Sequence, residues 1–185
     1  MPSVVDICNR ALILIGADTI MSLTEDTEVA RYCNAVYEQI RDEVLRAHVW
    51  NCCLARASLP RLSESPAWGY SYQYQLPSDC LRVVRFEDLD TDYKIEGRKL
   101  LTNASSAKIL YIKRETDPNQ YDPLLIGCIA ARLAAELAYP IANSADLAKQ
   151  MWALYERKLA EAKAVDGGEG KPEEFEVDEW LESRL

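Results

Sequence analysis

The spacing of apolar residues changes twice along this chain, and that change limits the folds open to it. Up to about residue 48 they recur every three to four residues, as in amphipathic helices. From about 50 to 115 they alternate with polar residues, as in half-buried strands, and after residue 122 helical spacing returns. The order predicts an α+β fold: a four-helix body with a small antiparallel β-sheet inserted between its two helical pairs.

The start and stop signals of the first helical pair are clear in the sequence. We expect the four helices at about residues 4–15, 25–48, 123–139 and 144–165. Ser3 with Asp6 three residues on resembles a capping box, and Gly16 can end the first helix in a left-handed turn. Thr24 or Thr27 can cap the second helix.

The second helical pair has equally local signals. Asp122 followed by Pro123 is an N-cap with proline at the first helical position. We expect this third helix to stop before Pro140 and the fourth to be capped by Asn143 and Ser144.

Within the insert, turn residues separate short alternating segments. The expected strands cover about residues 50–62, 70–76, 81–86, 92–96, 99–102 and 107–113. Gly97 and Arg98 stand at a hairpin-like turn between two of them. Asp88, Asp90 and Asp92 read as a turn with solvated acids, because they lack the full pattern of a calcium loop.

An aromatic strip marks the second strand of the insert. It consists of Trp68, Tyr70, Tyr72 and Tyr74. One interpretation is a strand face that packs on the helices. The other is a subunit interface, where Tyr and Trp bury large areas at low entropic cost.

Composition narrows the classes of function. With 185 residues, 49% of them apolar, the chain fits one domain with a real core. A net charge of −9 and a pI of about 4.7 argue against a protein that grips nucleic-acid phosphates. We expect no membrane span and no signal peptide, and hence a cytoplasmic protein whose six cysteines are small buried hydrophobes.

Little in the sequence indicates catalysis. The single histidine, His48, is expected to cap the second helix or to shield the edge of the core. It could form a nucleophile pair with Cys52 or Cys53, but we expect these on a strand, pointing to opposite faces, with no third group to orient the base. The spacing fits no zinc site and no phosphate loop. We therefore expect no catalytic, cofactor or metal site.

The last twenty residues form a separate acidic segment after the domain-sized region 1–165. Residues 166–185 carry eight acidic side chains against Lys171 and Arg184, which is −6 of the net charge of −9. Gly167, Gly168 and Gly170 suggest a hinge. The large apolar residues beyond it are Phe175, Val177, Trp180 and Leu181. Spaced apolar groups in an acidic tail favour a docking segment, and a plain solvated tail is the alternative.

Several segments of the chain together resemble one known protein family. They are Ala11-Leu12, Ile15-Gly16, Ser22-Leu23-Thr24-Glu25-Asp26, Ala30, Tyr37, Arg41, Leu45 to Trp50, and the stretch from Tyr74 to Val83 that reads as strand, turn and strand. With these residues the chain resembles the tail tubular protein A family, the head-to-tail adaptors of short-tailed phages. The resemblance depends on the order of these segments over roughly residues 5–165. It also depends on the order of the expected elements, which is helices, then sheet, then helices.

The resemblance implies a structural virion protein without catalytic residues. Members of this family form a dodecameric ring at the head–tail junction, between the portal protein and the tail nozzle or tube. DNA passes through the lumen without specific binding, and the subunits assemble in the host cytoplasm. Three alternatives stay open: the related connector of long-tailed phages, a small cysteine hydrolase using His48 with Cys52 or Cys53, and a monomeric adaptor that binds partners through its tail.

Overall fold

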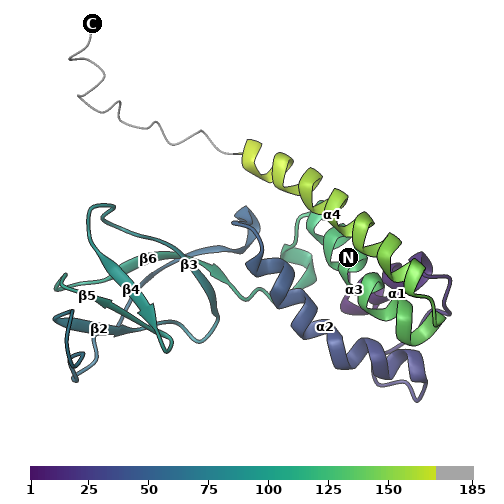
Figure 1. Ribbon diagram of the computed structural model, residues 1–185, viewed down its shortest axis with the longest axis horizontal. Helices are drawn as coiled ribbons and strands as arrows, with labels where there is room; N and C mark the ends of the chain where they lie inside the picture. The colour runs from purple at the N-terminus through teal and green to yellow at the C-terminus, as the bar shows by residue number, and fades with distance from the viewer. Residues whose placement is uncertain (170–185) are drawn as a thin grey trace, which may run out of the picture.

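The computed structural model describes residues 1–169, and these form an α+β fold with the predicted order of elements. The helices are α1 (Val4–Leu14), α2 (Glu28–Arg46), α3 (Pro123–Ala142) and α4 (Ala145–Gly168). The strands are β1 (Leu54–Ser58), β2 (Tyr72–Gln75), β3 (Cys80–Phe86), β4 (Tyr93–Glu96), β5 (Lys99–Thr102) and β6 (Lys108–Lys113). The helices gather at one end of the molecule and the strands at the other (Figure 1).

The first two helices begin where their caps predict. Ser3 and Asp6 form the expected capping box, in which the Asp6 amide donates to Ser3 Oγ and the Ser3 amide to the Asp6 carboxylate. The side-chain bond from Ser3 holds the pKa of the Asp6 carboxyl below its ordinary value. Of the two candidates for the second cap, Thr27 is the one used: its hydroxyl accepts from the Ala30 amide at 3.2 Å.

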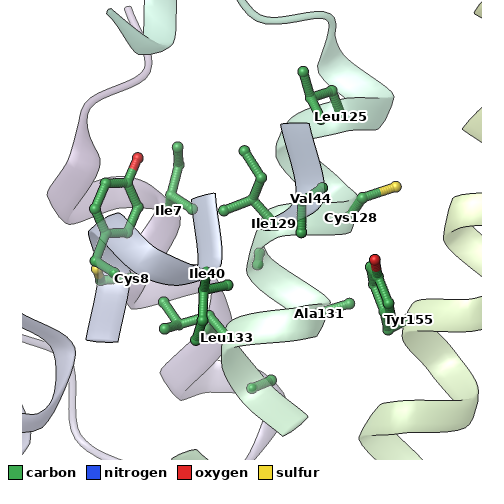
Figure 2. Packing of buried hydrophobic residues seen from close by; sticks show 14 of the residues in the cluster. Ile7, Cys8, Ile40, Val44, Leu125, Cys128, Ile129, Ala131, Leu133 and Tyr155 are labelled. Carbon is green, nitrogen blue, oxygen red and sulfur yellow. The ribbon is translucent and has the colours of Figure 1, made fainter. Parts of the chain in front are cut away.

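Helix α3 is the centre of the helical body. It packs against α1, α2 and α4, and Figure 2 shows Ile129 pointing toward Ile7 of α1 and Leu133 beside Ile40 of α2. It is the one helix of the described residues long and apolar enough to cross a membrane, with a mean hydropathy of 1.6, but 61% of that stretch is buried inside the protein. Its apolar surface is explained by contact with three neighbouring helices.

Both helices of the second pair run further than expected. Pro140 lies inside α3, in its last turn, where it removes only one backbone hydrogen bond and Asn143 caps the end in a left-handed conformation with φ 48°. Helix α4 continues through Gly167 to Gly168, so these two glycines do not form the expected hinge. The low helix propensity of glycine is overridden by tertiary contacts of Asp166, described below.

The insert holds two three-stranded antiparallel sheets, where the alternation predicted one. Sheet A has the order β1-β6-β3 and sheet B the order β2-β5-β4. Their facing sides enclose a second core that includes Tyr74 and Leu100 from sheet B with Ile109 and Tyr111 from sheet A. The opposite side of sheet A contributes Ile112 to the helical core, which joins the two ends of the molecule.

The β4–β5 turn and the start of β1 each depend on local geometry. Gly97 and Arg98 both have positive φ, 52° and 61°, as a tight hairpin turn requires, and this confirms the predicted turn.

Residues Asn51–Cys53 form a short 3₁₀ helix, so Cys52 and Cys53 do not lie on a strand as expected.

Candidate partner-binding surface

The structure divides the aromatic strip into an exposed part and a buried part. Trp68 is 85% exposed, and Tyr70 and Tyr72 are half-buried. Tyr74 is only 1% exposed, and its hydroxyl donates to the Ala104 carbonyl at 2.8 Å inside the second core. Tyr74 therefore holds the two sheets together, and the surface that a partner could reach is limited to the other three residues.

Two contacts tie the first part of the loop before β2 to sheet B. The Arg61 guanidinium lies 3.8 Å from the centre of the Tyr72 ring, a cation–π contact. The side-chain amide of Gln73 (Nε2) donates to the Glu64 carbonyl at 2.9 Å. Gly69, with φ 89°, allows the chain to reverse directly after Trp68. These contacts hold an exposed tryptophan on an ordered loop.

Beside this tryptophan, the outer side of sheet B is hollowed. The hollow has a volume of about 440 Å³, and its lining includes Trp68, Tyr70, Lys94, Glu96 and Lys99. Lys94 and Glu96 form an exposed ion pair at 2.8 Å, which raises the pKa of Lys94 through the hydrogen bond and charge of Glu96. Interfaces between proteins are enriched in aromatic residues at the centre and have a polar rim, and Trp68 with the charged groups beside it fits that pattern.

Four of the predicted interface residues lie outside the described residues. They are Phe175, Val177, Trp180 and Leu181. The predicted docking role of the acidic segment therefore rests on its sequence alone.

One acid assigned to the tail belongs to the helical body. Asp166 is 8% exposed, and both of its carboxylate oxygens have partners: Oδ1 accepts from the Asn51 amide at 3.0 Å, and Oδ2 lies 3.1 Å from His48 Nε2. The Asn51 side chain also donates to the Asp166 carbonyl at 2.7 Å. The last turn of α4 is thereby fixed to the segment that leads into β1.

This arrangement gives the single histidine an orienting carboxylate, which the sequence did not indicate. His48 also stands edge-on to the buried Trp50, with 4.8 Å between ring centres, so it covers the edge of the core as expected. Asp166 is 118 positions away from His48, and nothing in the local sequence around either residue predicts the contact.

Cys52 is the least buried of the six cysteines, which are all free. Its sulfur lies 3.8 Å from that of Cys53, and the hydrogen bond from Cys53 lowers the pKa of Cys52 to about 7, whereas that bond and burial raise the pKa of Cys53. Cys52 is the more exposed of the two thiols and has the lower pKa. This is expected when two coupled thiols together carry one negative charge, because the charge is then more stable on the thiol nearer to solvent.

Among residues 1–169, no three His, Cys, Asp or Glu side chains are placed to hold a metal ion. Asp88 forms the expected turn, since its carboxylate accepts from the Asp90 amide and the Thr91 hydroxyl.

A scan against protein-family models found no match to this chain, and a search of curated proteins likewise found none.

Proposed function

We propose that this protein is a structural head-to-tail adaptor of a short-tailed phage, of the tail tubular protein A type. Twelve copies would form a ring between the portal and the tail nozzle or tube, through whose lumen the DNA passes. The observation that carries the proposal is the order of elements, in which one β-rich insert with its own core separates two helical pairs. The segment from Tyr74 to Val83, on which the resemblance partly rests, spans β2, a turn and β3.

The shape of the molecule supports a role in a closed ring. Ring contacts are heterologous, so each subunit needs two different complementary surfaces. The helices lie at one end of this chain and the two sheets at the other, so the two ends can present different surfaces to neighbouring subunits (Figure 1). The exposed Trp68 at the strand end is the residue type that most often dominates interface energy.

The test is assembly on the portal protein of the same phage. The purified chain is mixed with that portal, and size-exclusion chromatography with light scattering measures the mass of the complex. We expect a portal complex that carries about twelve copies, the number that the resemblance to the tail tubular protein A family implies, arranged in a closed ring. Elution of the two proteins as separate species at micromolar concentration would contradict the proposal.

Trp68→Ala should weaken this assembly, with Leu89→Ala as the matched control. Leu89 is also an exposed apolar residue, 73% accessible, but it lies in the β3–β4 connection. Truncation of a central interface aromatic typically costs about 2–4 kcal/mol of binding free energy. Equal assembly of both variants would remove Trp68 from the interface.

A second candidate, a thiol enzyme, is favoured by one specific observation. Cys52, with a pKa lowered to about 7, follows directly after Asn51, which shares the Asp166 carboxylate with His48. A cysteine hydrolase needs a nucleophilic thiol, a base and a group that orients the base, and Cys52, His48 and Asp166 are residues of these three types. A cysteine-directed activity probe that labels Cys52 and fails to label the His48→Gln variant would favour this candidate.

A further inference from the structure

Two thiols that are neighbours in the sequence are also neighbours in space. Cys52 and Cys53 lie in the short 3₁₀ helix that precedes β1, and their sulfur atoms are 3.8 Å apart. A disulfide bond holds its two sulfurs ~2.05 Å apart, so a movement of less than about 2 Å would bring these two into bonding distance. The hydrogen bonds of a 3₁₀ turn have poorer geometry than those of an α-helix, so such a turn yields more easily to a movement of this size.

The two thiols differ in exposure, and this difference sets the order in which they can react. Cys52 is half-buried, whereas Cys53 is only 1% exposed. The hydrogen bond from Cys53, with a smaller contribution from the Asp122 backbone, lowers the pKa of Cys52 to about 7, although burial and the carboxylates of Asp166 and Asp122 act in the opposite direction. A small reagent in solution therefore meets the Cys52 thiolate first, and Cys53 can react only with a group already attached to Cys52.

The sulfur of Cys52 lies at the start of α3. Asp122, whose backbone forms a hydrogen bond with it, is the N-cap of that helix. The positive end of a helix dipole stabilises a thiolate, and the reactive thiols of redox proteins often lie at such a position. Cys52 is thus held where a thiolate is stabilised and partly exposed, as the attacking thiol of a thiol–disulfide exchange must be.

We propose that Cys52 and Cys53 form a redox-active pair that reacts with low-molecular-weight disulfides of the glutathione type. In the first step the Cys52 sulfur bonds to one sulfur of the reagent, the S–S bond of the reagent breaks, and one small thiolate leaves. In the second step Cys53 gives up its proton to water, its sulfur bonds to that of Cys52, and the second small thiolate leaves. Two protein thiols are thereby oxidised to one disulfide, and one small disulfide is reduced to two small thiols.

The first step also prepares Cys53 for the second. In the reduced protein the hydrogen bond with Cys52, burial and the negative charge on Cys52 all raise the pKa of Cys53, while Glu115 and Lys113, which pair with each other at 2.8 Å, act in opposite directions. Once Cys52 is joined to the reagent it carries no negative charge, so its opposition to a thiolate at Cys53 ends. The resolving thiol is therefore activated only after the attacking thiol has reacted.

The resulting bond is strained and should be easy to reverse. Neighbouring Cα atoms are about 3.8 Å apart across a trans peptide bond, whereas bridged cysteines usually have Cα atoms about 4.4–6.8 Å apart. Strained disulfides have higher reduction potentials than structural ones and are the labile, regulatory or catalytic class. The pair should therefore close with an excess of the small disulfide and reopen with an excess of the small thiol.

A second pair of thiols, in the helical core, does not offer the same chemistry. Cys8 and Cys33 also share a hydrogen bond, but both are 0% exposed. A reagent in solution cannot reach either sulfur while the protein stays folded. This second pair is an internal control for the selectivity of the reaction.

Thiol mapping of the full chain tests the proposal. The reduced protein is incubated with oxidised glutathione at neutral pH, the reaction is stopped with acid, and the remaining thiols are alkylated in denaturant before tryptic digestion and mass spectrometry. Cleavage after Arg46 and Arg56 releases the peptide 47–56, which holds Cys52 and Cys53 and no other cysteine. We expect this peptide first to carry one glutathione and then to become lighter by two hydrogen atoms, with no alkylation.

The same digest reports reversal and selectivity. An excess of reduced glutathione should return the peptide 47–56 to its doubly alkylated form. The peptides that hold Cys8 and Cys33 should stay alkylated throughout, because the folded core protects them.

Two single substitutions separate the two steps. Cys53→Ala should stop the reaction at the mixed disulfide, so that the peptide 47–56 keeps its glutathione. Cys52→Ala should abolish both products, because the buried Cys53 is not reached directly. Cys80→Ala is the matched control: Cys80 is another largely buried cysteine, 6% exposed, but it lies in the sheet core, and its loss should leave both products at the wild-type yield.

Three results on the wild-type protein would overturn the proposal, whether or not the variants fold. The first is a peptide 47–56 that stays fully alkylated or keeps its glutathione without closing. The second is oxidation of Cys8 and Cys33 as fast as that of Cys52 in the folded protein. The third is a disulfide found only in a dimer band on a non-reducing gel, which would join two copies of Cys52. Each result is independent of assembly on a portal, so this proposal and the adaptor function succeed or fail separately.

Discussion

At the scale of single residues, the two cores depend on side chains that the apolar pattern identifies well. Leu45 on α2 and Leu133 on α3 each belong to a run of apolar residues at helical spacing, which predicts a core position, and both are 0% exposed. They lie on facing surfaces of the two helices, which pack against each other directly. The cost of truncating them depends on how far the surrounding side chains can relax into the space.

Leu45→Ala or Leu133→Ala should each lower the free energy of unfolding by about 2–5 kcal/mol, because each leaves a cavity in the helical core. Urea denaturation followed by circular dichroism measures the change. Leu89→Ala, at a site 73% exposed, is the control and should shift stability by less than about 0.5 kcal/mol. Equal stability of all three variants would mean that the helical core is not where the structure places it.

Cys52 should be the most reactive of the six thiols near neutral pH. Only its thiolate reacts, so the rate should rise as the pH passes its lowered pKa of about 7, whereas burial raises the pKa of Cys128 to about 11 and keeps that thiol inert. Iodoacetamide labelling of the folded protein between pH 5 and 9, read by mass spectrometry, measures the profile, with Cys52→Ser as the blank. A midpoint at the ordinary thiol value of about 8.5 would exclude an activated Cys52.

At the scale of elements, local signals predicted where helices begin better than where they end, whereas the ends of β3, β4, β5 and β6 were predicted correctly. The caps at Ser3, Asp122 and Ser144 set the helix starts because side-chain hydrogen bonds within three residues decide them. The end of α4 was misplaced because a contact between residues more than a hundred positions apart decides it, and no local pattern records such a contact. The division of the strands between two sheets escaped prediction for the same reason.

The candidate surface was predictable only in part. Alternation placed Tyr70, Tyr72 and Tyr74 on one strand face, but it could not say which of them would meet the opposing sheet. The burial of Tyr74 is decided by strands β5 and β6, which follow it by at least 25 residues. The orienting role of Asp166 needed the packed fold as well.

Gly167→Ala and Gly97→Ala should change stability in opposite directions. Gly167 is helical and has nothing within 4 Å of an added Cβ, so alanine should stabilise by about 0.5 kcal/mol. Gly97 has φ 52°, where a side chain is strained, so alanine should destabilise by about 1 kcal/mol. Thermal unfolding of both variants compares the signs; no gain from Gly167→Ala would favour a hinge at that position over a helix.

At the scale of the whole molecule, two cores joined through sheet A make the chain a rigid two-ended unit. Ile112 lies in the helical core and Ile109 and Tyr111 in the sheet core, although all three are on β6. An ion pair between Arg114 and Asp42, at 2.6 Å, adds a polar contact between the chain after β6 and α2.

The free protein should be monomeric or weakly associated, and a ring should form only on its template. Each copy carries a net charge of −9, so twelve copies brought together would repel one another before any contact is made. Light scattering at physiological salt and micromolar concentration should give the mass of one chain, 20.9 kDa. Raising the salt to about 1 M, where the Debye length falls to ~3 Å, should increase association if charge is the barrier. A stable dodecamer at physiological salt would contradict this prediction. It would show that the contacts between subunits are sufficient to form a ring without a portal. It would also show that the negative charge lies on surfaces that do not meet in the ring.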